Sequence, residues 1–184
     1  MKYFILEVDQ AYIPPRPTNW YGRLDVKALA GKRHYELPKH MVFQVEQHMQ
    51  MVWTDIIMEP CFMLGSRAKE VLELYEPSLR FVRVIFSDKE KFYSQPYYIP
   101  SLAGAPALTE NSKFNLNRSV IHHAEVNGSV LRDRAIVRVT NVNQSNCVLI
   151  RSDIAESLLT NNTIGIGLRE TDIIMPCASG RSRF

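Results

Sequence analysis

The residues that come nearest to a reactive site are two adjacent histidines, His122 and His123, followed by Glu125. Imidazole and carboxylate groups bind zinc, and a bound zinc ion can activate water for hydrolysis. Residues 120–126 have the composition of a β-strand, in which neighbouring side chains point to opposite faces, so the two imidazoles cannot easily bind one metal ion. We expect one histidine to pack inward and the other to face solvent. A metal-dependent hydrolase that uses these three residues is an alternative hypothesis.

Further histidines lie earlier in the chain, among carboxylates. The set consists of His34, His40 and His48 with Glu36, Glu46 and Asp55. Such residues can converge on a metal ion in three dimensions, and one of these histidines would complete the hydrolase site described above. Zinc sites usually carry a characteristic spacing, such as His-Glu-x-x-His or Cys-x-x-Cys, and the chain has neither. We therefore predict no metal ligands and no cofactor.

A nucleophilic catalyst has equally little support. The Gly-x-Ser-x-Gly turn of α/β-hydrolases does not occur. The widely spaced cysteines, Cys61, Cys147 and Cys177, match neither a catalytic signature nor a disulfide framework, and the first two lie in apolar runs where a thiol usually fills the core. The Gly-Ile-Gly segment at 165–167 follows a predicted helix instead of leading from a strand into one, so we do not expect it to bind phosphate. We predict that the chain is not an enzyme and has no catalytic residues.

A proline-rich stretch near the N-terminus offers better material for binding. Its aromatic and arginine residues are Tyr12, Arg16, Trp20, Tyr21 and Arg23. These residue types dominate the energetic hot spots of protein interfaces, and prolines at 14, 15 and 17 reduce the entropy lost when such a loop is immobilised. We predict that these five residues bind a partner. The alternative is that Trp20 and Tyr21 fix the loop to the core of the protein itself.

A second group of aromatic residues lies beside the charged residues 89–91. It consists of Phe92, Tyr93, Tyr97 and Tyr98. We expect this group to pack as a core cluster at the edge of a strand, because aromatic side chains are more often buried in their own protein than shared with a partner.

Hydrophobic patterning predicts strands and two amphipathic helices. Expected strands cover residues 3–8, 41–53, 81–86, 97–99, 120–126, 135–142, 147–151 and 164–168, and residues 101–118 are expected to be loop. The helices follow Ser66 and Ser152, each predicted as an N-cap, and their apolar stripes are formed by residues 68, 71, 72 and 75 and by residues 154, 155, 158 and 159. Each stripe must be buried against a sheet. The predicted fold is α+β, a mixed, mostly antiparallel sheet with two main amphipathic helices packed on it. A regulatory module that binds a small ligand in a pocket between the sheet and the helices is a further alternative hypothesis.

The two helical segments follow one plan. Residues 62–72 align with residues 148–158 and match at a serine, a glutamate and a leucine. An internal duplication would explain the match, and shared capping rules alone would also produce it. Both explanations stay open.

Composition limits the class of protein. The chain has 184 residues, of which 46% are hydrophobic and 22% charged, as in an ordinary globular protein. Its 22 basic and 19 acidic residues give a net charge of +3, which is too balanced for a nucleic-acid binder. No 18 apolar residues run together, and the first ten residues lack a signal-peptide core. We therefore expect a cytoplasmic protein that binds neither nucleic acid nor membrane.

The expected domain organisation is simple. Residues 54–175 are predicted to form the α+β core domain. Residues 1–53, with the first strand and the proline-rich loop, are predicted to belong to the same unit. Residues 176–184 are polar and basic and are predicted to be a disordered tail.

About two-thirds of the chain, residues 54–172, resembles a bacterial family of immunity proteins from polymorphic toxin systems, the family numbered eleven, formerly a domain of unknown function. The matching runs are 66–72 (SRAKEVL), 81–84 (FVRV), 97–100 (YYIP), 118–126 (RSVIHHAEV), 148–153 (VLIRSD) and 163–168 (TIGIGL). These runs are mostly core pattern and carry no catalytic residue.

The resemblance implies a cytoplasmic protein, encoded beside a toxin gene, that protects the producing cell by binding and blocking that toxin. An inhibitor of a strongly basic nuclease usually presents an acidic surface, which steers the association. The net charge of +3 therefore argues mildly against such a partner, although a local acidic patch is compatible with that total.

Overall fold

The computed structural model of the chain describes residues 2–25, 38, 40–46, 48–131, 134–143 and 146–174. Its helices are α2 (Ser66–Tyr75), α3 (Gly128–Leu131) and α4 (Ser152–Thr160). Its strands are β1 (Tyr3–Val8), β2 (His40–Gln44), β3 (Ile56–Ile57), β4 (Met63–Leu64), β5 (Phe81–Asp88), β6 (Tyr93–Pro100), β7 (Gly104–Ala105), β8 (Lys113–Phe114), β9 (Ile121–His123), β10 (Glu125–Asn127), β11 (Ile136–Val139), β12 (Val148–Arg151), β13 (Ile166–Glu170) and β14 (Asp172–Ile174). In this part of the chain, no helix is long and apolar enough to cross a membrane.

The strands form two five-stranded sheets and two small ribbons. The first sheet has the order β13-β1-β12-β11-β7, the second β2-β5-β6-β4-β3, and the ribbons pair β10 with β14 and β8 with β9. The pairs β7–β11, β2–β5 and β10–β14 are parallel and the other strand pairs antiparallel. The predicted α+β fold with mixed, mostly antiparallel pairing is confirmed.

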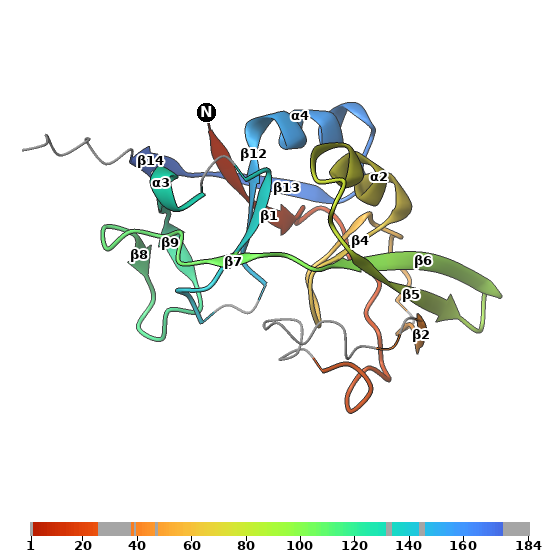
Figure 1. Ribbon diagram of the computed structural model, residues 1–184. Helices are drawn as coiled ribbons and strands as arrows, with labels where there is room; N and C mark the ends of the chain where they lie inside the picture. Colours follow the sequence, from red (N-terminus) through yellow and green to blue (C-terminus); the bar gives the residue numbers. More distant parts are fainter. Residues whose placement is uncertain are drawn as a thin grey trace, which may run out of the picture.

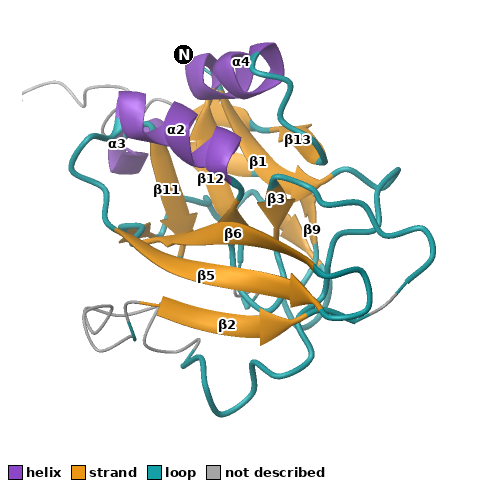
Figure 2. Ribbon diagram, turned by 90° about the vertical axis from the view of Figure 1, so that its right-hand side faces the viewer, coloured by secondary structure: helices purple, strands orange, loops and turns teal. Residues whose placement is uncertain are grey.

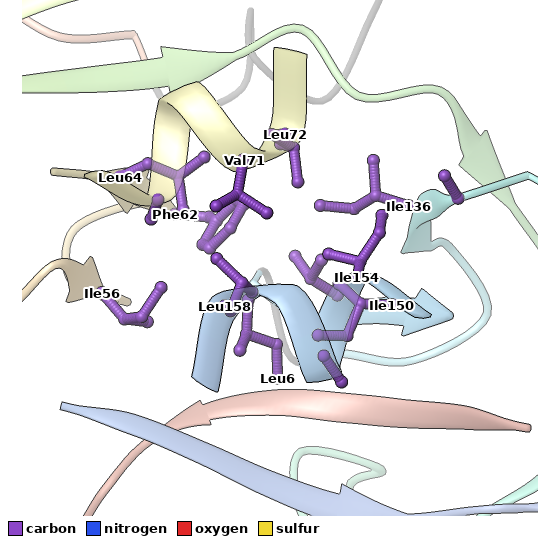
Figure 3. Close-up of a cluster of buried hydrophobic side chains, with 14 residues drawn as sticks. Leu6, Ile56, Phe62, Leu64, Val71, Leu72, Ile136, Ile150, Ile154 and Leu158 are labelled. Carbon is purple, nitrogen blue, oxygen red and sulfur yellow. The ribbon is translucent and has the colours of Figure 1, made fainter. Parts of the chain in front are cut away.

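Helices α2 and α4 lie side by side on these sheets (Figures 1 and 2). Between them lies a hydrophobic cluster that takes residues from both helices and both large sheets (Figure 3). Its helical members are Ala68, Val71, Leu72, Ile154, Ala155 and Leu158. The predicted stripes are confirmed with one error: Leu159 is 54% exposed, because it lies on the side of α4 that faces away from the cluster, next to the buried Leu158. This cluster joins the two sheets into one packed body.

The opposite faces of the sheets are covered by other segments. The second sheet packs on a cluster that includes Leu24, Phe43, Phe86 and Tyr97, with Trp20 and Trp53 against it. The first sheet packs on residues of the 105–131 segment. Strand β1 lies between β12 and β13, while β2 extends the second sheet beyond β5, so residues before position 54 are built into both sheets.

The predicted N-caps are wrong by one position. Ser66 and Ser152 are the first helical residues, and the N-caps are Gly65 and Arg151, without a side-chain capping bond. The cause is that each helix starts directly from a strand: only Gly65 separates β4 from α2, and Arg151 ends β12. A carboxylate supplies negative charge near each helix start instead. Asp153 lies in the first turn of α4, and the side chain of Asp55 lies against Gly65.

Several strand boundaries also differ from prediction. The strand expected over residues 41–53 ends at Gln44, because the following backbone forms only isolated bridges with the proline-rich loop. Residues 120–126 form two strands interrupted at Ala124, since β9 pairs with β8 and β10 pairs with β14. The strand expected over residues 135–142 covers only Ile136–Val139. The strand expected over residues 97–99 extends through Tyr93–Pro100, and residues 101–118, expected to be loop, contain the short strands β7 and β8.

Asp55 connects the two sheets through two hydrogen bonds to Ile164, and a third hydrogen bond fixes the start of α2. Its backbone N–H donates to the Ile164 carbonyl (2.8 Å), and its Oδ2 accepts the Ile164 N–H (2.9 Å) just before β13. Its carbonyl accepts the Gly65 N–H (2.8 Å) at the start of α2. Thr54 contributes next to it, because its carbonyl accepts the buried hydroxyl of Tyr97 (2.9 Å). We call this arrangement, centred on Thr54 and Asp55, the Asp55 junction.

Close packing leaves no room for side chains at the Asp55 junction. A Cβ added to Gly65 would lie 2.4 Å from Asp55 Oδ1. Gly165 has φ of +78°, and a Cβ there would lie 2.6 Å from Thr54 Cγ2. Both positions therefore require glycine, one for space and the other for space and backbone conformation.

Replacing Leu72 by Ala tests the cluster between the helices. Leu72 is 1% exposed, so we expect a loss of about 2–5 kcal/mol in the free energy of unfolding, measured by denaturant titration. Leu74→Ala is the matched control on the same helix, since Leu74 is 77% exposed and its removal leaves no cavity. Equal effects of the two substitutions would contradict the described packing.

The substitution Asp55→Asn tests the Asp55 junction, because it removes a carboxyl whose protonation makes the free energy of unfolding depend on pH. Burial, the largest cause, raises the pKa of the Asp55 carboxyl above its ordinary value. As the pH falls from 7 to 4, the folded wild type takes up this proton before the unfolded chain does. The wild type should therefore gain stability relative to Asp55→Asn over this range. Urea titrations at several pH values measure the difference, and the amide oxygen of Asn can still accept the Ile164 N–H.

Asp153→Asn is the control with the opposite sign. Arg151, whose Nη2 lies 2.7 Å from Asp153 Oδ2, holds the pKa of that carboxyl below its ordinary value. The unfolded chain therefore binds this proton first, and the wild type should lose stability relative to Asp153→Asn as the pH falls. Parallel pH profiles of the two variants would refute the assignment.

Candidate protein-binding site

Backbone hydrogen bonds fix the proline-rich loop to the segment that follows β2. The N–H groups of Glu46 and Val52 donate to the carbonyls of Arg16 (2.8 Å) and Ile13 (2.9 Å). At the far end of the loop, the Thr18 N–H donates to the Gln44 carbonyl (2.9 Å). The three prolines cannot donate, and the loop presents carbonyl acceptors to this segment instead. The loop is therefore held in place by backbone hydrogen bonds to the rest of the fold.

Three adjoining hollows surround Arg16. The first has a volume of about 380 Å³ and lies between the end of β1, the loop and residues 57–59. The second, about 370 Å³, is lined by Arg16, Pro17, Trp20, Glu46, Glu59 and Pro60. The third, about 340 Å³, is lined by Ile13, Pro14, Arg16, Glu46, His48 and Met51. Together they form a surface that we call the Arg16 groove.

The five predicted binding residues divide between this groove and the neighbouring surface. Tyr12, Arg16 and Trp20 line it, and the guanidinium of Arg23 lies 5.6 Å from the centre of the Phe43 ring. Tyr21 is 87% exposed, and its ring centre lies 5.9 Å from that of Trp20 in an edge-on arrangement.

Trp20 and Tyr21 have different environments although they are neighbours. Trp20 is partly buried against the core cluster of the second sheet, and its carbonyl accepts the N–H groups of Arg23 and Leu24 (both 3.0 Å). Its ring anchors the loop. Tyr21 projects into solvent, where an aromatic ring with a hydroxyl can be buried by a partner.

Four carboxylates at the Arg16 groove escaped prediction as site residues. Glu7 and Asp9 come from the end of β1, Glu59 follows β3, and Glu46 had been considered only as a metal ligand. They are separated by up to 52 positions in the chain, between Glu7 and Glu59, so no local spacing relates them. Only the pairing of β1 and β3 with their sheets brings them together.

The paired histidines do not lie as expected. His122 and His123 are both exposed, whereas one was predicted to pack inward. The break at Ala124 is the reason, because Ile121 and Ala124 both point inward and leave the two histidines between them on the surface. His123 Nε2 lies 3.3 Å from Asp172 Oδ2, and the Glu125 carboxylate accepts hydrogen bonds from Thr109 and Asn111.

The second histidine set is also dispersed. His34 and Glu36 lie outside the described residues. His40 and His48 are exposed, and Asp55 is buried in the Asp55 junction. Among the residues that the structure describes, no three His, Cys, Asp or Glu side chains could hold a metal ion together.

The remaining candidates are structural. Cys61 and Cys147 are buried, which raises the pKa of both thiols, that of Cys147 to about 12. Cys177 lies outside the described residues.

The residues of the second aromatic group do not form one cluster. Tyr97 is fully buried on one face of β6, and Phe92 is exposed between β5 and β6. The expected single edge cluster is therefore wrong, because Tyr97 lies on the inward face of β6 whereas Phe92 lies in the solvent-facing turn before that strand.

No family model matches the chain, and no curated protein matches its sequence. The geometry of the Arg16 groove and of the adjoining exposed aromatic loop therefore carries the functional argument.

The substitutions Trp20→Ala and Tyr21→Ala test whether Trp20 fixes the loop to the core while Tyr21 contributes little to stability. We expect Trp20→Ala to lower the free energy of unfolding by about 1–3 kcal/mol, because it removes partly buried contacts. Tyr21→Ala should change it by less than about 0.5 kcal/mol, since the ring is almost fully exposed. Thermal and urea denaturation measure both. A large loss for Tyr21→Ala would show that this ring serves the fold.

Proposed function

We propose that this chain is a protein-binding module that recognises a partner with residues 12–23 and the Arg16 groove. The observation that carries the proposal is the exposure of Tyr21 on a loop that is fixed by Trp20 and by backbone hydrogen bonds. An immobile loop loses little entropy on binding, so burial of its exposed aromatic and arginine side chains contributes directly to affinity.

The more specific proposal is an immunity protein that neutralises a cognate bacterial toxin in the cytoplasm. Its support is the resemblance of residues 54–172 to the immunity family numbered eleven. The proposed binding surface lies mostly in residues before position 54, outside the stretch with that resemblance. Such a division suits immunity proteins, since a shared scaffold can carry a recognition surface specific to one toxin.

Binding to the product of the neighbouring gene tests this function. We expect the two proteins to co-elute in size-exclusion chromatography as a one-to-one complex, and co-expression to restore growth. Combined Tyr21→Ala and Arg23→Ala substitutions, at two exposed residues of the loop, should weaken binding at least about tenfold, which corresponds to about 1.4 kcal/mol. Isothermal titration calorimetry measures this change.

Leu116→Ala is the control for exposed apolar surface. Leu116 is fully exposed and lies between β8 and β9, away from the loop, so its loss should leave the affinity unchanged. Absence of co-elution together with absence of growth rescue would refute the immunity function. An intact complex with the double variant would refute the proposed surface.

A further inference from the structure

The Arg16 groove combines an apolar floor with an acidic rim. Its first hollow is lined by the buried residues Ile5, Leu6 and Ile57 together with Met58, Pro14 and Pro15. Glu7, Asp9 and Glu59 line the same hollow, and Glu46 lines the two adjoining ones. A ligand that fits must therefore carry an apolar stem and a positive end.

Two of the four negative charges at the groove lack a counter-charge. Glu7 Oε1 lies 2.6 Å from Arg169 Nη2, and Asp9 Oδ1 accepts the Ala11 N–H (2.9 Å). The carboxylates of Glu46 and Glu59 have no ion pair or side-chain hydrogen bond within the described part of the chain. The four carboxylates are thus balanced by two guanidiniums: Arg16 lines all three hollows, and Arg169, outside them, pairs with Glu7. His48 also lines the third hollow.

From this geometry we infer that the Arg16 groove receives an arginine or lysine side chain from the surface of the partner protein. This inference rests on the proposed function and specifies its partner. Arginine and lysine bury their methylene stems on apolar surface and keep the charged head group among polar groups. Here the stem lies over the partly buried Met58 and Pro14, and the head group reaches Glu59 and Glu46.

Charge complementarity selects this occupant. The phosphates of a nucleic acid would be repelled by the four carboxylates. The net charge of +3 argues against a basic partner only when the charge is treated as uniform. Locally the sign is reversed, and a negative rim raises the rate at which a basic protein associates. The partner surface that meets the groove is therefore basic.

A small probe tests the pocket itself. N-acetyl-arginine amide supplies the stem and the guanidinium, and N-acetyl-citrulline amide is its uncharged isostere. In two-dimensional NMR titrations, we expect the arginine probe to shift the amide signals of residues 7–10 and 57–59, with a dissociation constant of about 1–10 mM. The citrulline probe should bind at least about fivefold more weakly, because it lacks the charge.

Glu46→Gln combined with Glu59→Gln should weaken the arginine probe at least about fivefold. Glu156→Gln, an exposed carboxylate on α4, is the matched control and should have no effect. Shifts outside the groove, equal binding of citrulline, or an unchanged affinity of the double variant would overturn the inference.

The partner protein separates this inference from the proposed function. If the complex forms and depends on Tyr21 but the arginine probe leaves residues 7–10 and 57–59 unshifted, the function stands and the basic side chain is refuted. If the arginine probe binds as expected but no partner co-elutes, the proposed function fails at its own test. If the arginine probe binds and the partner also co-elutes, the Glu46→Gln and Glu59→Gln double variant should associate with the partner more slowly. The association rate of this variant should also depend less on salt concentration.

Discussion

The two sheets depend on one buried carboxylate, that of Asp55. Its backbone and side chain both bond Ile164, so β3 and β13 cannot shift past one another without breaking two hydrogen bonds together. Its carbonyl also fixes Gly65, from which α2 starts. Burial makes the charge costly, and the hydrogen bond from Ile164 offsets part of that cost. Strand β13, which follows Ile164, pairs with β1, and the end of β1 and residues 57–59 line the same hollow of the Arg16 groove.

Local sequence patterns predicted the structural features that are determined by residues close together in the chain. Tyr3–Val8 is a strand as expected, and the buried faces of α2 and α4 follow their 3.6-residue periodicity. Asn162, two positions after the end of α4, adopts the left-handed conformation, with φ of 52°, which asparagine tolerates better than most residues. The Asp55 junction could not be predicted, because Asp55 and Ile164 are 109 positions apart and nothing in the sequence indicates that they meet.

In the candidate site, too, the residues of one continuous loop could be predicted, whereas the carboxylates contributed by separate segments could not. The types of Arg16, Trp20 and Tyr21 suggested contact with a partner, but only burial separates the anchor from the displayed ring. The negative rim was missed because its members come from three separate segments. Glu7 and Asp9 could have given a partial signal, since both lie at the end of a strand where a sheet meets solvent.

A fixed loop beside an acidic groove has a consequence for specificity. Tyr21 gains free energy from any apolar surface that covers it, so it favours many partners. The groove is more selective, because a neutral or acidic side chain there would leave Glu46 and Glu59 desolvated without a counter-charge. In the proposed complex, affinity and selectivity thus come from adjoining parts of one surface. Substitution at Tyr21 can therefore change the affinity without disturbing Trp20, which fixes the position of the loop.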